Sequence, residues 1–157
     1  MGDDSQKMSV SRLVHVSPER AWTELTDAWV YTSWVVGATH IRNVDDNWPE
    51  PGSKLHHTVG PWPLMIKDHT EVLEAEPPRR LVLNARAWPV GEARIELNLD
   101  PVAEGTQITM MEWPVRGPGA WARNPLMDAL LRARNRESLG RLAALVENRP
   151  PVNYDRS

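Results

Sequence analysis

The chain has 157 residues, of which 41% are hydrophobic and 25% charged, and it carries a net charge of −3. These values are typical of one globular domain with its own core and exclude a disordered chain. Because there is no cysteine, disulfides, thiolate catalysis and cysteine-ligated zinc are excluded. No apolar run of about 18 residues occurs, so no membrane span is expected. The start, MGDDSQKMSV, lacks the apolar stretch of a signal peptide, so we expect a soluble cytoplasmic protein.

The first third of the sequence predicts one strand and two short helices. Residues 7–16 alternate between apolar and polar positions, which predicts a strand. Ser17 and Pro18 form a helix start, because serine is a favoured cap and proline suits the first helical position. A second short helix is predicted from Asp27 to Trp34, ended by Gly37.

A meander of strands is predicted next. After a loop at residues 45–52, strand-like segments follow at residues 54–60, 64–75, 80–88, 93–100 and 106–115. Turn signals at residues 77–78, 89–91 and 104–105 separate several of them. Connections this short predict antiparallel hairpins.

The last predicted element is a long helix. Asn124 and Pro125 repeat the cap-then-proline signature, and helical character continues to about Glu147. An apolar stripe at the helical period is formed by Met127, Leu131, Leu142 and Leu145, and we expect this stripe to be buried. The segment from Arg116 to Arg149 is basic while the rest is acidic. We interpret this as a basic helix on an acidic sheet rather than as a nucleic-acid surface.

The element order predicts an α+β fold in which an antiparallel sheet of six to seven strands curves around the C-terminal helix. The sequence resembles the SRPBCC superfamily of START-like, polyketide cyclase-like and birch-pollen-allergen-like helix-grip proteins. The resemblance rests on HVSPERAW, on Trp34 with Gly37, on PGSKL, EVLEAEPPRRLVL and EGTQITM, and on the closing helix. It implies a single domain at residues 7–148, a disordered tail at 1–6, a C-terminal tail at 149–157 and an apolar ligand cavity. It implies no common catalytic residue.

Strand alternation predicts which polar side chains face that cavity. Glu112 continues an inward set with Ile108 and Met110. Asp68 and Thr70 share a side with Ile66 and Val72, and His57 shares a side with Leu55 and Val59. A single β-bulge would reverse any of these assignments.

On the helix, Arg134 and Ser138 fall in the middle of the apolar stripe. A buried guanidinium needs an anion, so we expect Arg134 to pair with Glu112 or Asp68. The alternative is that its methylenes cover the core while the charge reaches solvent.

Four tryptophans precede proline, at residues 48, 62, 88 and 113. They mark strand ends or loops. They either rim the mouth of a cavity or plug one end of the core.

Three functions fit the sequence. In the first, a small hydrophobic or aromatic, lipid- or polyketide-like ligand binds near Trp34, His57, Asp68, Met110, Glu112, Leu131, Arg134 and Ser138. In the second, the same cavity is a cyclase or dehydratase site, with His57 as acid or base, Asp68 or Glu112 orienting it and Arg134 steadying an enolate. In the third, the protein is a ligand-free interaction module. We expect no cofactor, no metal and no nucleic acid, and either a monomer or a homodimer.

Overall fold

The computed structural model describes residues 7–60, 63–87, 91–118 and 124–150. The elements in chain order are β1 (Met8–Val14), α1 (Pro18–Leu25), η2 (Ala28–Val30), α2 (Tyr31–Trp34), β2 (Ala38–Val44), β3 (Lys54–Val59), β4 (Ile66–Glu76), β5 (Arg80–Ala87), β6 (Gly91–Val102), β7 (Gly105–Arg116) and α4 (Pro125–Asn148). The expected tails at residues 1–6 and 151–157 lie outside the described residues.

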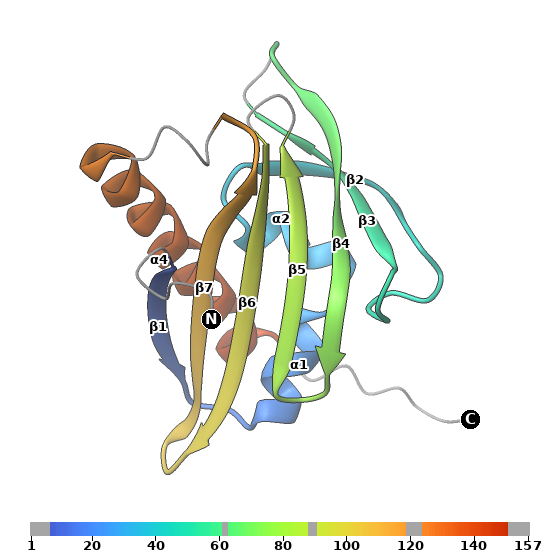
Figure 1. Cartoon of the computed structure of the whole chain (residues 1–157). Coiled ribbons are helices and arrows are strands. Elements are labelled where there is room, and N and C mark those ends of the chain that lie inside the picture. Colours follow the sequence, from blue (N-terminus) through green and yellow to red (C-terminus); the bar gives the residue numbers. More distant parts are fainter. Residues whose placement is uncertain (1–6, 61–62, 88–90, 119–123, 151–157) are drawn as a thin grey trace.

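The strands form one seven-stranded sheet in the order β1-β7-β6-β5-β4-β3-β2, and every neighbouring pair is antiparallel. Figure 1 shows this sheet curving strongly, with the helices on its concave side. The predicted fold is therefore confirmed. One strand was not among the segments predicted from the sequence: β2, which forms one edge of the sheet.

Both predicted helix caps form. The Ser17 side chain accepts a hydrogen bond from the backbone N–H of Arg20 at the start of α1. Asn124 does the same for the N–H of Met127 at the start of α4, at 2.9 Å. Since the first N–H groups of a helix have no partner within it, these side chains fix where each helix begins.

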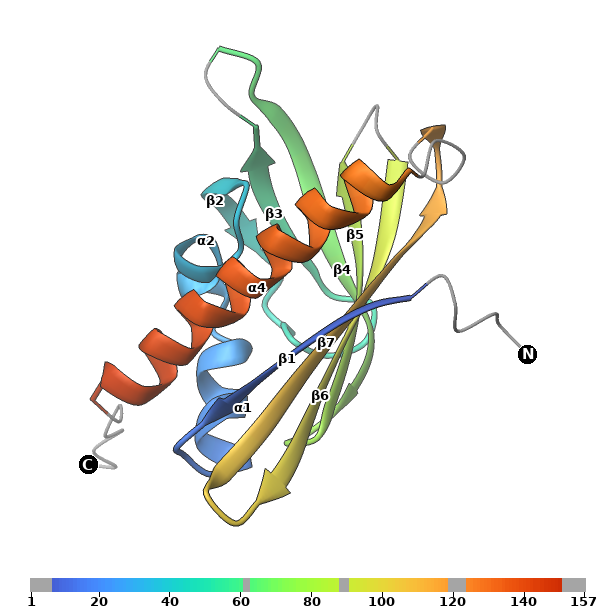
Figure 2. The ribbon, with the colours of Figure 1, turned by 90° about the vertical axis from the view of Figure 1, so that its left-hand side faces the viewer.

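The helix α4 crosses the concave face of the sheet diagonally, with α1 and α2 beside it (Figure 2). Its buried residues are Asn135, Ser138, Leu139, Leu142, Ala143 and Val146, and none lies in the ten residues before Asn135. The expectation that Met127 lies on a buried stripe is wrong, because its side chain is 54% exposed. The buried face is rotated from the predicted stripe, so that Leu142 is buried and Leu145 only partly buried.

The core lies under the C-terminal half of α4. It joins leucines and valines of the central strands to α1 and α2, with Leu55, Leu83, Leu97, Leu99 and Ile108 among its most buried members. Trp48 packs against this core and donates its indole N–H to the carbonyl of Thr26. This tryptophan therefore helps to close one end of the core. Trp62 and Trp88 lie outside the described residues.

Candidate functional site

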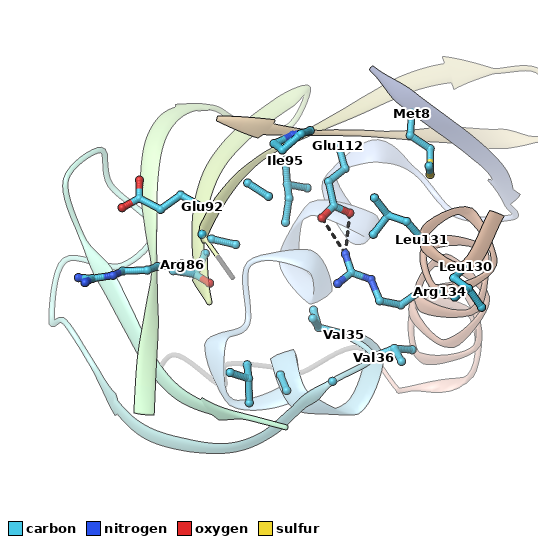
Figure 3. A pocket seen from close by; sticks show the side chains of 18 of the residues that line it. Met8, Val35, Val36, Arg86, Glu92, Ile95, Glu112, Leu130, Leu131 and Arg134 are labelled. Atoms are coloured by element: carbon cyan, nitrogen blue, oxygen red, sulfur yellow. Dashed lines mark hydrogen bonds and ion pairs between the residues drawn. The ribbon is translucent and has the colours of Figure 1, made fainter. Parts of the chain in front are cut away.

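A cavity of about 780 Å³ lies between α2, the N-terminal half of α4 and the sheet, all seven strands of which contribute to its lining. Much of its wall is apolar, with Val35, Ala38, Val59, Ala93, Ile95 and Leu131 among the lining residues. The cavity exists because the N-terminal half of α4 does not pack onto the sheet, and the sheet curves away beneath it. Figure 3 shows Arg134, Leu131 and Leu130 on α4 along one side of this space and Glu112 on the sheet.

One ion pair reaches into the cavity. The Arg134 guanidinium donates through Nη2 to both carboxylate oxygens of Glu112, at 2.8 and 2.6 Å (Figure 3). The neighbouring Asn135 donates its amide to Glu112 Oε2 at 2.7 Å and accepts from Arg134 Nε and Nη2 through Oδ1. Three side chains thus form one closed hydrogen-bonded group.

Arg134 pairs with one of the two predicted acids, Glu112, and within this pair only the carboxylate is deeply buried. The Glu112 side chain is 6% exposed, whereas that of Arg134 is 41% exposed. The guanidinium is therefore less buried than expected. Arg134 lines the cavity and lies beside the core rather than within it.

His57 ends a hydrogen-bonded chain at the cavity wall. Its Nε2 lies 2.9 Å from Thr70 Oγ1, which lies 3.2 Å from the Tyr31 hydroxyl. The imidazole also stacks on the Tyr31 ring, with centroids 5.7 Å apart. All three residues line the cavity. His57 is therefore oriented by Thr70, and the expectation that Asp68 or Glu112 would orient it is wrong.

Burial lowers the pKa of His57 to about 4, although the Asp68 carboxylate opposes this shift. Burial likewise raises the pKa of the Tyr31 phenol. Both groups are therefore neutral at pH 7. A neutral imidazole with a low pKa is a weak base, because general-base catalysis works best when the pKa lies near the operating pH.

The lowered pKa makes stability depend on pH. The unfolded chain takes up the His57 proton near pH 6.5 and the folded chain near pH 4, so stability falls as pH drops through that window. We expect a loss of about 2 kcal/mol between pH 7.5 and pH 5. Urea unfolding at the two pH values measures it, with His57→Phe as the comparison. If the variant loses as much stability as the wild type over this range, the assignment to His57 is wrong.

Asp68 does not join the site. Its side chain is buried, accepts a hydrogen bond from the backbone N–H of His69 and lies 4.0 Å from Arg86 Nε. It is not among the residues that line the cavity. Strand alternation placed it correctly on the inner side, opposite His57 in the register, but β4 carries it away from Arg134.

The remaining predicted residues lie deeper. Trp34, Met110 and Ser138 line a second cleft of about 20 Å³ that adjoins the main cavity, and Arg134 and Glu112 line both. Ser138 accepts a hydrogen bond from the N–H of Val36 through its hydroxyl, at 3.1 Å. The predicted ligand-binding residues are thus split between a wide cavity and a narrow inner cleft.

Sequence reasoning missed Tyr31 and Asn135. Tyr31 lies on a helix of four residues, which is too short for its periodicity to reveal an inward face. Asn135 was missed because it does not lie on the face of the helix that was predicted to be buried. Thr70 was placed on the inner side of its strand, but nothing in the sequence linked it to His57.

No group of three or more His, Cys, Asp or Glu side chains among the described residues is arranged to hold a metal ion. His56 and His69 face each other across β3 and β4 with ring centroids 6.2 Å apart, and Asp45 lies 3.5 Å from His56. Within the described part of the chain, no helix is both long and apolar enough to cross a membrane.

Several solved structures share the fold at low sequence identity. Protein CV1439 from Chromobacterium violaceum is 20% identical with a TM-score of 0.68, over 90% of this chain and 98% of that one. DynU16, from the dynemicin biosynthetic locus, is 21% identical with a TM-score of 0.63, over 96% of this chain and 50% of that one. Ara h 8.0201 is 10% identical with a TM-score of 0.69, over 89% of this chain and 96% of that one. At these identities the likeness concerns the fold alone.

The comparison with protein families agrees with the fold. No curated protein matches the sequence. The model of a family described as polyketide cyclase / dehydrase and lipid transport matches residues 5–147. The chain therefore belongs to this family, within the SRPBCC superfamily that its motifs and its helix-grip fold indicate.

Proposed function

We propose that the protein binds a small hydrophobic or aromatic ligand in the cavity between the sheet and α4. The observation that carries this proposal is the cavity itself, about 780 Å³ in a protein of 157 residues. Small-molecule sites typically span about 300–1,000 Å³ and combine apolar walls with a few convergent polar groups. The apolar lining around the Glu112–Arg134 pair fits that description.

The distribution of charge within the lining supports an apolar interior. Arg86 and Glu92 are among the lining residues, but their side chains extend away from the interior (Figure 3). Arg116 and Asp128 also line the cavity, but Arg116 is exposed and Asp128 is partly exposed. The buried Glu112 carboxylate is paired with Arg134 at 2.6 Å, so the two charges neutralise each other. A ligand therefore meets an interior with no net charge from this pair, which favours uncharged, largely apolar molecules.

Two alternatives receive less support. A cyclase or dehydratase would use His57, whose place on the Tyr31–Thr70–His57 chain suits proton transfer, but a pKa of about 4 makes it a weak base at neutral pH. A ligand-free interaction module would not need so large a cavity with apolar walls, which is typical of a small-molecule site.

Titration with a neutral apolar fluorophore such as aminoanthracene tests the proposal. We expect probe emission to rise and tryptophan emission to be quenched, both saturably, because the cavity has room for only a limited number of probe molecules. Unsaturable, linear changes would instead indicate partition onto the surface and would contradict the proposal.

A further inference from the structure

The inner cleft beneath the main cavity is rich in hydrogen-bond donors. It measures about 20 Å³ and is lined by Tyr31, Trp34, Val35, Leu83, Ile95, Met110, Glu112, Arg134, Asn135 and Ser138. Five of these, Tyr31, Val35, Ile95, Glu112 and Arg134, also line the main cavity. A molecule in the main cavity can therefore extend one small group toward this cleft. The space suits a single oxygen-sized group, because about 10–15 Å³ is enough for one water.

Three donor groups on residues that line the cleft have no acceptor among the described residues. The indole Nε1–H of Trp34 is buried and has no hydrogen-bond partner. Because the residue is only 2% exposed, bulk water cannot readily take that place. Arg134 uses Nε and Nη2 for Glu112 and Asn135, which leaves Nη1 free of bonds to described groups. Ser138 accepts from Val36, so the hydrogen of its own hydroxyl is available.

The carboxylate and amide oxygens of the same cleft already accept hydrogen bonds. Both oxygens of Glu112 accept from Arg134, and Oε2 also accepts from Asn135. The amide oxygen of Asn135 accepts from Arg134 Nε and Nη2, at 3.3 and 3.2 Å. A buried donor without a partner costs about 1–3 kcal/mol. The groups of the cleft that still lack a partner are therefore hydrogen-bond donors, and an acceptor atom of a ligand would satisfy them.

The charge of the cleft favours a neutral acceptor. The single positive charge of Arg134 is already balanced by Glu112 at 2.6 Å. A carboxylate on the ligand would add a second anion beside the buried Glu112 carboxylate, and an uncompensated charge at such a place is costly. A carbonyl oxygen adds no net charge and can accept two hydrogen bonds.

We propose that the ligand is an apolar ring system or chain with an uncharged acceptor oxygen, such as a ketone, at its inner end. That oxygen is received by the N–H of Trp34 and by Nη1 of Arg134. This inference rests on the proposed function, since it specifies which molecules the same cavity takes and which end enters first.

Fluorenone and fluorene provide a matched pair of probes, because they share one ring skeleton and differ by a carbonyl in place of a methylene group. Displacement of aminoanthracene measures the affinity of each. We expect fluorenone to bind about tenfold more tightly than fluorene, as one or two buried hydrogen bonds would give. Fluorene carboxylate should bind more weakly than fluorenone because of its charge.

The variant Trp34→Phe removes the indole donor and keeps an aromatic ring. We expect it to weaken fluorenone binding about five- to tenfold while fluorene affinity changes less than about twofold. Trp29→Phe is the control, because Trp29 is 69% exposed and does not line either space. It should leave both affinities unchanged.

The outcomes separate this inference from the proposed function. Equal affinities for fluorenone and fluorene in the wild type would overturn the acceptor preference and leave the cavity a ligand site. Equal weakening of both by Trp34→Phe would mean that Trp34 contributes packing only, which also overturns it. Tighter binding of fluorene carboxylate than of fluorenone would overturn the preference for an uncharged acceptor. Failure of aminoanthracene, fluorene and fluorenone alike to bind would overturn the proposed function itself.

Discussion

Replacing Leu142 with alanine should lower the free energy of unfolding by about 2–5 kcal/mol. Leu142 is 0% exposed and lies on the part of α4 that packs against the core. The substitution loses the transfer free energy of the side chain and leaves a cavity in a densely packed region. Urea unfolding at pH 7.5 measures the loss. The slope of the unfolding free energy against urea concentration should not change.

Leu130→Ala is the matched control on the same helix. Leu130 is 57% exposed and lies in the half of α4 that spans the cavity, so we expect a change within about 0.5 kcal/mol. Similar losses at both positions would mean that α4 packs along its whole length. The cavity between the helix and the sheet would then be absent in solution.

The second large effect concerns the ion pair. Arg134→Met should cost about 3 kcal/mol of stability, because it leaves the buried Glu112 carboxylate with only the amide of Asn135 as a partner. Breaking a buried pair typically costs about 3–5 kcal/mol. The lower end applies here because Arg134 is partly exposed.

The double variant Arg134→Met/Glu112→Leu should recover most of that loss, because no charge is then stranded. Glu112→Leu alone should be milder than Arg134→Met, since Arg134 can be hydrated from the cavity side. We expect a coupling energy of about 1–3 kcal/mol from the full cycle, measured by urea unfolding. Additive single effects would contradict the pairing of these two side chains.

Most of the fold could be predicted from the sequence because its signals are local. Ser17 and Asn124 cap the helices at the expected residues, and short turns between alternating segments dictate an antiparallel meander. The exact pairing of the strands is harder to predict from the sequence. Register shifts occur between Val72 and Glu74 on β4 and between Glu92 and Ala93 on β6, and such irregularities are not visible in an alternation pattern.

The candidate site could be predicted only in part. Glu112 and Arg134 were recognisable because each is a charge on an apolar face. Asp68 had the same signal, yet its strand places it outside the cavity lining, since alternation fixes a side of the sheet and not a position along it. The stripe on α4 was predicted as if the whole helix packed on the sheet. The buried residues of α4 begin only at Asn135, which the predicted stripe did not include.

A cavity-filling variant tests the central claim most directly. Ala93 lines the cavity from β6, opposite Pro114 in the register, so Ala93→Trp places an indole in the space that a ligand would occupy. Ala144→Trp adds the same side chain on the exposed face of α4 and is the control. With aminoanthracene as the probe, we expect saturable binding by the wild type and by Ala144→Trp, and at least about tenfold weaker binding by Ala93→Trp. Equal binding by all three folded proteins would contradict a ligand site in this cavity.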